Sequence, residues 1–304
     1  MSVSLNKSKS IGKVLFVVEG GWTEPYILRR IFTTIFDYQF ETVLRDKKYS
    51  KYNSKENATS QVFVINAEES NIKNIDKDNQ FLNRLFAELI ENYDFDVDNA
   101  AIYYLFDRDS KSNTDVAFIK DMLSVLVNAR DNEGYERQGM LLMSYPSIES
   151  FTVSNFEENS FNKSFDTGHN VKIYAHSQNF NNQKLSEDTL LHATSELLNA
   201  LKVIEQKNFD IESFGDTSRK VFEYEERTYQ KTSQYRLLSL VVIALIDLGL
   251  VEVEEQTEEE SCNDKGLLDI LAEAEEDVRT GRVAPVEDMF ANIRTMLQEK
   301  CDRK

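Results

Sequence analysis

The chain has 304 residues, 41% of them hydrophobic and 11% aromatic, with a formal net charge of −18. This composition excludes an intrinsically disordered polymer, and the length suffices for one large core or two modest domains. The negative charge favours solubility and disfavours nonspecific binding to polyanions. The first 60 residues are the exception, because they carry ten Lys and Arg against six Asp and Glu.

The cysteines and the apolar segments indicate the cellular compartment of the protein. Cys262 and Cys301 lie far apart and outside any metal-ligand spacing, so we expect a reduced, cytoplasmic protein. Lys7, Lys9 and Lys13 precede an apolar run of only strand length, which argues against a secretory signal. The longest apolar segment, 237–246, is too short to cross a bilayer and predicts a buried helix. We therefore expect no association with a membrane.

Strands and helices alternate in the first half of the chain. Strands are predicted over 12–18, 61–65, 100–106 and 139–143, and helices over 23–36, 78–91 and 116–129, with a polar loop over 45–60. Thr23 suits the N-cap of the first helix, and Pro25 is tolerated in its first turn. This alternation favours an α/β fold with a mostly parallel sheet covered by helices on both faces.

The pattern changes after about residue 155. Residues 156–182 are rich in Asn, Ser and Phe and lack periodicity, apart from a short strand predicted at 171–174. Helices are predicted over 186–207, 218–230 and 234–247. We therefore expect a first domain over 1–155, an α-rich accessory region over 156–253, and an acidic linker with a short helical tail over 254–304.

Carboxylates follow two of the predicted strands. Glu19, followed by Gly20 and Gly21, ends the first strand, and Asp107 and Asp109 end the third. Parallel strands end at one edge of a sheet, where open α/β folds bind ligands, so three carboxylates are expected to meet there and to need a cation. Residues two apart in a strand point the same way. The alternative for Glu19 is an acid that caps a helix, and the alternative for Asp107 and Asp109 is a polar surface turn.

A third cluster, SYPSIESF over 144–151, follows the fourth strand. Pro146 and Ser147 fit a helix start, and Glu149 suits the first turn of a helix without any catalytic role. The cluster gains interest because three successive strand ends then present acids or hydroxyls to one side.

Cations and aromatic residues near the N-terminus suit nucleic acid. Tyr49 and Tyr52 interleave with lysines in the polar loop, which can grip phosphates and stack bases, or be only a solvated connection. The candidate phosphate contacts are Arg29, Arg30, Lys47, Lys48 and Arg108. The histidines His169, His176 and His192 are expected to be exposed or locally bonded.

The strings VEGGWTEPY, FDRD and SYPSIESF, in this order, resemble the TOPRIM domain of RloB-type and OLD-family nucleases. In those proteins a VEG-x-x-TE-like segment, a DxD segment and a later S-x-P-x-x-E segment build a magnesium site. The resemblance covers residues 12–155 and implies a TOPRIM-like catalytic domain. It implies Glu19 as a metal ligand or general base and Asp107 and Asp109 as metal ligands. Glu24 and Glu149 would be supporting or second-metal ligands, and Ser147 a minor contributor.

The resemblance implies a Mg²⁺-dependent nuclease, with Mn²⁺ as a substitute, that cleaves RNA, tRNA among them, or DNA in prokaryotic defence against phage. OLD proteins carry a fused ABC-type ATPase, and this chain has no Walker motif, so an ATPase partner would be a separate polypeptide. The alternatives are a non-nucleolytic module with nucleotidyl-transfer or primase-like chemistry, or a regulatory role. In the latter, the acidic second half docks on a partner or forms a homo-oligomer.

Overall fold

The computed structural model describes residues 2–41, 49–67, 72–73, 80–130, 139–205 and 214–254. Lys47, Lys48 and the predicted tail from residue 255 lie outside the described residues. Val3–Glu252 form one compact unit, and Met1–Ser2 with Val253–Lys304 form the other. No helix in the described part of the chain has the length and hydrophobicity that crossing a bilayer requires.

A mixed eight-stranded sheet forms the centre of the larger unit, in the order β11-β8-β6-β2-β5-β4-β3, with β7 also paired to β8. Its parallel core consists of β5 (Gln61–Asn66), β2 (Lys13–Val18), β6 (Ala101–Asp107) and β8 (Gly139–Tyr145). The antiparallel strands are β3 (Tyr38–Glu41), β4 (Tyr49–Ser54), β7 (Val127–Asn128) and β11 (Leu238–Ser239). The predicted α/β class with a mostly parallel sheet flanked by helices is confirmed at this level.

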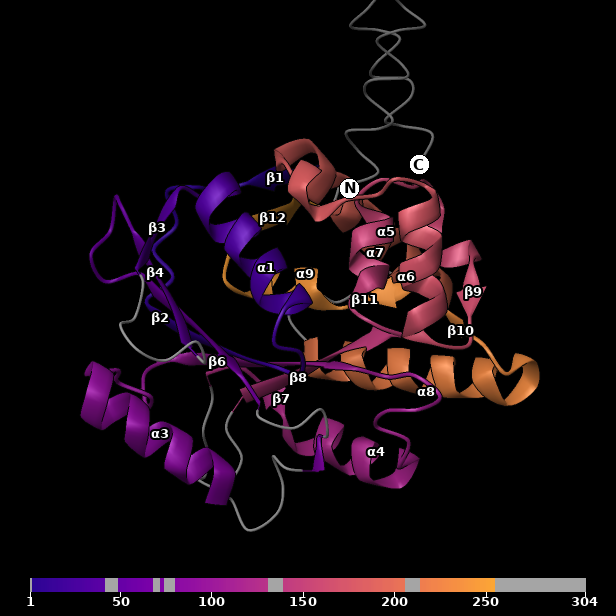
Figure 1. Ribbon diagram of the computed structural model, residues 1–304, viewed down its shortest axis with the longest axis horizontal. Helices are drawn as coiled ribbons and strands as arrows, with labels where there is room; N and C mark the ends of the chain where they lie inside the picture. Colours follow the sequence, from indigo (N-terminus) through magenta and orange to yellow (C-terminus); the bar gives the residue numbers. More distant parts are fainter. Residues whose placement is uncertain are drawn as a thin grey trace, which may run out of the picture. The chain divides into compact units, whose positions relative to one another are not determined.

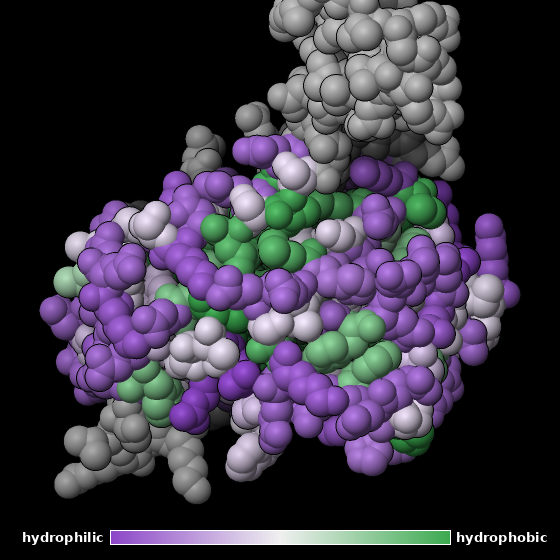
Figure 2. Space-filling view, turned by 90° about the horizontal axis from the view of Figure 1, so that it is seen from above, coloured by the Kyte–Doolittle hydropathy of each residue, from purple (hydrophilic) through white to green (hydrophobic). Residues whose placement is uncertain are grey.

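Helices cover both faces of the sheet. Figure 1 shows α1 (Thr23–Arg30) and α9 (Val241–Asp247) above it, and α3 (Gln80–Tyr93) and α4 (Val116–Val125) below it. The interiors of the parallel strands are accordingly apolar, as burial on two faces requires, and polar residues stand only at or near the strand ends. Phe16 of β2 stacks on Tyr103 of β6, with ring centroids 5.2 Å apart. Seen from above, the outer surface is mostly hydrophilic, with hydrophobic patches between (Figure 2).

The strand order places a topological switch point at the centre of the sheet. The parallel strands follow the chain as β2, β5, β6 and β8, but lie side by side as β5-β2-β6-β8. The chain therefore moves to one side of β2 and then returns to the other, so that the order reverses between β2 and β6. Ligands of open α/β sheets bind at the carboxyl ends of the strands at such a point. Glu19 and Asp107 stand at these two strand ends.

Three predictions in the first half need correction. The helix predicted over 23–36 is α1 followed by a π-helix, η1 (Ile31–Ile35), and Thr23 is its first residue rather than its cap. The loop predicted over 45–60 contains β4, because Tyr49 and Tyr52 are buried when β4 pairs with β5. The helix predicted over 116–129 stops at Val125, and β7 follows by pairing with β8.

In the second half, the strand predicted at 171–174 is wrong. These residues belong to α6 (Gly168–Ser177), whose N-cap Thr167 accepts a hydrogen bond from the backbone N–H of Asn170 and whose buried Val171 and Ala175 are four residues apart. The helix predicted over 234–247 is also wrong in its first part, which forms β10 (Tyr235–Arg236) and β11 before α9. The helices predicted over 186–207 and 218–230 are confirmed as α7 (Glu187–Glu205) and α8 (Phe214–Thr232).

The remaining elements are short. They are β1 (Ser2–Leu5), which pairs with β12 (Val251–Glu254), then α5 (Glu149–Ser154), η3 (Ser160–Asn162), β9 (Ser164–Phe165), which pairs with β10, and η4 (Asn182–Lys184). Because β11 pairs with β8, the sheet includes a strand from the second half of the chain.

Candidate functional site

Glu19 lies at the end of β2 and is buried, with 8% of its surface exposed. Its backbone N–H donates to the carbonyl oxygen of Leu105, which continues the β2–β6 pairing by one residue. Its Oε2 accepts hydrogen bonds from the backbone N–H of Asp107 at 2.7 Å and from Nδ2 of Asn113 at 3.1 Å. Burial, with smaller contributions from the charges of Glu24 and Asp109, raises the pKa of Glu19 to about 7.

Asp107 ends β6 beside Glu19, and its Oδ1 accepts a hydrogen bond from the backbone N–H of Ile148 at 2.8 Å. Burial raises the pKa of Asp107 well above its usual range, and the charges of Glu19, Glu24 and Glu149 raise it further. The charge of Glu19 can raise the pKa of Asp107 in this way only because the two carboxyl groups lie close together. The structure therefore brings Glu19 and Asp107 to one place, as the strand ends predicted.

Asn113 is a residue of the site that the sequence reasoning missed. It is buried and adopts a left-handed backbone conformation with φ of 53°. Its Nδ2 donates to Glu19 and to the backbone carbonyl of Asp107 at 2.8 Å, while its Oδ1 accepts from the backbone N–H of Ile72 at 2.9 Å. Asn tolerates positive φ better than most residues, so an Asn in the polar loop after β6 was the one sign in the sequence of a special backbone conformation there.

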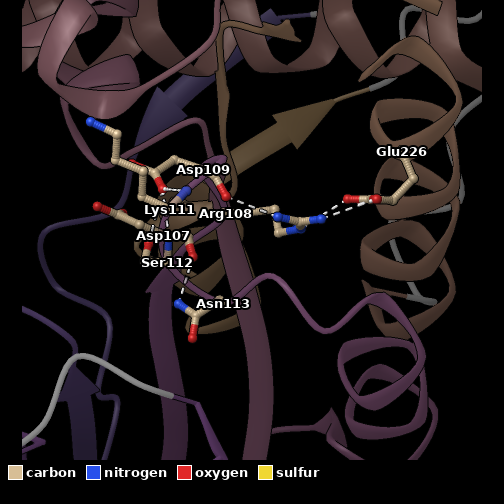
Figure 3. Close-up of polar contacts among 7 residues, drawn as sticks. All are labelled: Asp107, Arg108, Asp109, Lys111, Ser112, Asn113 and Glu226. Carbon is tan, nitrogen blue, oxygen red and sulfur yellow. Dashed lines mark hydrogen bonds and ion pairs between the residues drawn. The ribbon is translucent and has the colours of Figure 1, made fainter. Parts of the chain in front are cut away.

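Asp109 closes the turn that follows β6. Its Oδ1 accepts hydrogen bonds from the backbone N–H groups of Lys111 at 2.6 Å and Ser112 at 2.7 Å (Figure 3). Its Oδ2 accepts one from the backbone N–H of Gly168 at 3.4 Å. This is the surface-turn role that the sequence left open for Asp109. One oxygen is therefore committed to the turn.

Arg108 points away from the carboxylates. Its guanidinium is buried and meets the carboxylate of Glu226 on α8 (Figure 3). It also lies over the ring of Tyr235, 5.3 Å from the ring centroid. A guanidinium held in a buried ion pair does not face a substrate phosphate, so we leave Arg108 out of the proposed substrate contacts.

Glu24 and Glu149 join Glu19, Asp107 and Asp109 in what we call the acidic cluster. Glu24 is 5% exposed, and its Oε1 accepts a hydrogen bond from the backbone N–H of Gly20 at 3.1 Å. Burial raises the pKa of Glu24, the charge of Glu149 raises it further, and Lys172 lowers it. Oε2 of Glu149 accepts a hydrogen bond from the hydroxyl of Ser147 at 2.8 Å.

Gly20 leaves room for the carboxylate of Glu24. A Cβ on Gly20 would come within 3.0 Å of the carboxyl carbon of Glu24. The first of the two glycines therefore allows the close approach of this carboxylate to the strand-to-helix turn.

The acidic cluster fits a hard divalent cation in donor type but not in its present arrangement. Carboxylate oxygens are the ligands that Mg²⁺ prefers. A bound cation also stabilises the ionised form of buried carboxyl groups, whose raised pKa values show that ionisation is otherwise unfavourable. Among the described residues, however, no group of three or more His, Cys, Asp or Glu side chains is arranged to hold a metal ion. Hydrogen bonds occupy Oε2 of Glu19 and Oδ1 of both aspartates. Side chains would have to rearrange for several of these acids to share an ion.

The expected nucleic-acid contacts near the N-terminus are largely engaged elsewhere. The Arg29 guanidinium lies 4.4 Å from the ring centroid of Phe40, and the Arg30 side chain donates to the backbone carbonyls of Gln183 and Leu185. Tyr49 and Tyr52 are buried in β4 and present no ring face to solvent, so base stacking on them is ruled out in this structure. The basic segment is thus used mainly for packing, as far as the structure describes it.

Of the histidines, His192 is locally bonded, as expected, with its Nδ1 2.8 Å from the backbone carbonyl of Ser154. His169 and His176 belong to α6, and both are exposed, as expected.

Together, the fold and the site define an α/β protein with buried carboxylates at the switch point of its sheet. No known protein family, no curated protein and no solved structure matches the chain.

Proposed function

We propose that the protein is a Mg²⁺-dependent nuclease that hydrolyses phosphodiester bonds of nucleic acid, as an effector of anti-phage defence under the control of a partner ATPase. One observation carries the catalytic part: Glu19 and Asp107 are joined by a hydrogen bond at the switch point, where open α/β sheets bind ligands. The defence setting and the ATPase partner rest on the resemblance to TOPRIM nucleases alone.

Glu19 and Asp107 are the first candidates to hold the ion, with Glu24 and Glu149 as supporting ligands. Like charges gathered in a buried site favour a cation, and Lys172 is the cation whose charge reaches Glu24. A bound Mg²⁺ would supply Lewis-acid stabilisation of the developing negative charge and a more acidic water molecule. Asp109 has one oxygen committed to the turn, so we assign it a smaller part in ligation than the sequence suggested.

Where Asp107, Glu24 and Glu149 hold the ion, Glu19 suits the alternative role of general base. A carboxyl group whose pKa is about 7 can accept a proton near neutral pH, where an ordinary glutamate is too weak a base. Asn113 and the backbone N–H of Asp107 hold one oxygen of this carboxylate in place. The other oxygen, Oε1, accepts no hydrogen bond from the described residues and is the one that would take the proton.

The test is a cleavage assay with the purified full chain, Mg²⁺ or Mn²⁺, and single-stranded and duplex RNA and DNA. Glu19→Gln and Asp107→Asn keep the shape of each side chain and remove its charge, so we expect cleavage to fall at least about 100-fold, the usual contribution of a general base. Glu158→Gln is the matched control, because Glu158 is exposed and lies outside the site.

Two outcomes would overturn the proposal. Cleavage that survives both substitutions removes this mechanism. Incorporation of labelled nucleotides without strand cleavage replaces hydrolysis with nucleotidyl transfer at the same carboxylates.

A further inference from the structure

We propose that the groove beside the carboxylates binds one unpaired nucleotide of a single-stranded nucleic acid, with its base stacked on Trp22. This inference rests on the proposed nuclease function and names its substrate class. The groove lies between the start of α1 and the segment that runs from α6 to η4, and it encloses about 610 Å³.

Trp22 and Tyr26 form the aromatic wall of this groove. Trp22 is 87% exposed and Tyr26 is 39% exposed, and both line the groove. Trp22 is the N-cap residue of α1, and Tyr26 lies one turn later, where its backbone N–H donates to the carbonyl oxygen of Trp22. Exposed aromatic faces that no side chain covers are what nucleobases stack on in proteins that bind single strands.

The opposite wall offers hydrogen-bonding groups for the edge of a base. It includes His176, Asn179 and Gln183, whose side chains make no hydrogen bond among the described residues. Amide and imidazole groups can pair with the Watson–Crick edge of a base, which is free only when the base is unpaired. Asn182 is already engaged, because its Oδ1 accepts a hydrogen bond from Thr152.

The groove opens onto the acidic cluster. Glu149 lines the groove and also raises the pKa values of Asp107 and Glu24. Lys172 lines the groove, and its charge lowers the pKa of Glu24, so the groove lies within electrostatic reach of the cluster. A base held in the groove would therefore leave a neighbouring phosphate between Lys172 and the carboxylates.

Charge favours a single strand over a duplex. Duplex binding depends chiefly on many Lys and Arg contacts to phosphates, and the chain has a net charge of −18. Near the site, Arg108 is held by Glu226 and Arg30 by backbone carbonyls. Stacking must then supply much of the affinity, and only an unpaired nucleotide presents its full ring face.

The chain contains a single tryptophan, so its intrinsic fluorescence reports directly on Trp22. We would titrate the full chain, in EDTA to prevent cleavage, with single-stranded RNA, single-stranded DNA of the same sequence, their duplexes, and AMP. We expect both single strands to quench the fluorescence at concentrations where the duplexes and AMP do not. Comparing RNA with DNA shows which sugar the groove prefers.

The variants are compared by fluorescence anisotropy of a labelled single strand. Trp22→Ala should weaken binding by about 5- to 150-fold, the range that loss of one stacked base gives, whereas Trp22→Phe should keep most of the affinity. Ile173→Ala is the matched control, because Ile173 is 55% exposed on α6 but does not line the groove. Because Trp22 is exposed, its removal should leave the unfolding transition unchanged.

Binding and cleavage fail separately. Quenching by single strands without any cleavage in Mg²⁺ would overturn the nuclease and leave the groove assignment standing. Cleavage with unaltered Trp22 fluorescence and full binding by Trp22→Ala would overturn the groove assignment alone. Equal quenching by duplex or by AMP would also overturn it, as would a dimer that Trp22→Ala abolishes, since the indole would then cover a second copy of the chain.

Discussion

The guanidinium of Arg108 and the carboxylate of Glu226 form a two-point buried ion pair, with Nε 2.9 Å from Oε1 and Nη2 3.1 Å from Oε2. Nη1 of Arg108 also donates to the backbone carbonyl of Asp109 at 2.9 Å. Since Arg108 lies between the two aspartates, the pair fastens the loop after β6 to α8. The ion pair therefore positions Asp107 and Asp109, although the guanidinium points away from their carboxylates.

Glu226→Ala should destabilise the protein strongly. The substitution leaves the Arg108 charge buried and unpaired, which typically costs about 3–5 kcal/mol. The double variant Arg108→Met, Glu226→Leu removes both charges and should recover most of this loss. Urea unfolding of the three proteins measures the free energies, and a loss below about 1 kcal/mol for Glu226→Ala would show that the pair does not hold the loop.

Glu225 should make stability fall as the pH rises. It is fully buried, and burial raises its pKa from 4.5 to about 8, although the backbone N–H and the charge of Arg236 act in the opposite direction. Between these two values the folded chain keeps a proton that the unfolded chain has released. The free energy of unfolding therefore falls with rising pH, by up to about 1.4 kcal/mol per pH unit.

Glu225→Gln cannot titrate, so it should flatten this dependence. We would measure the free energy of unfolding of the wild type and the variant between pH 5 and 8, the range that the raised pKa sets, and compare how each depends on pH. Other buried acids such as Glu19 contribute a slope of the same sign to both proteins, so the difference between the two curves isolates Glu225. Parallel curves would contradict the assignment.

The parallel core of the sheet was predictable because its strands are unbroken apolar runs, and the two acids that end β2 and β6 came with it. Elements with weak local patterns were not. Tyr49 and Tyr52 sit among polar residues, and only pairing with β5 makes that segment a strand. Similarly, Val171 and Ala175 are too few to mark α6 as amphipathic, and the apolar run before α9 conceals two short strands.

The site divides in the same way. The meeting of Glu19 with Asp107 follows from strand ends. Glu24 was suggested by resemblance alone, and Glu149 by the resemblance and by the strand end that precedes its cluster. Asn113 escaped prediction because its role depends on a turn that brings it back beneath Glu19. The burial of Arg108 depends on Glu226, more than a hundred residues later, and nothing local signals that contact.

Asp109→Asn and Asp109→Ala should separate the two roles of Asp109. Asparagine keeps the oxygen that accepts hydrogen bonds from Lys111 and Ser112, so the fold should stay within about 0.5 kcal/mol of wild type, whereas alanine should lose about 1–2 kcal/mol. If Asp109 is also a ligand, both variants weaken Mg²⁺ binding. Thermal unfolding and calorimetric Mg²⁺ titration test the two roles, and unchanged Mg²⁺ affinity in Asp109→Asn would reduce Asp109 to a turn residue.

Asn113→Gly should raise the pKa of Glu19. The Asn113 amide donates to Oε2 of Glu19 and so stabilises the charged carboxylate and lowers its pKa. Glycine accepts a φ of 53° without strain, so the substitution removes the amide and keeps the backbone conformation. Because Glu19 must be ionised to bind metal or accept a proton, the rising limb of the pH–rate profile should move to higher pH than in the wild type.

Asn159→Gly is the matched control for this shift. Asn159 has nearly the same backbone conformation, with φ of 55°, and its side chain makes no capping hydrogen bond, so its loss should leave the profile in place. Direct titration of the Glu19 carboxyl carbon by NMR gives a second readout that does not depend on nuclease activity. A Glu19 titration that is the same in Asn113→Gly and in the wild type would mean that the amide holds the loop after β6 without tuning the acid.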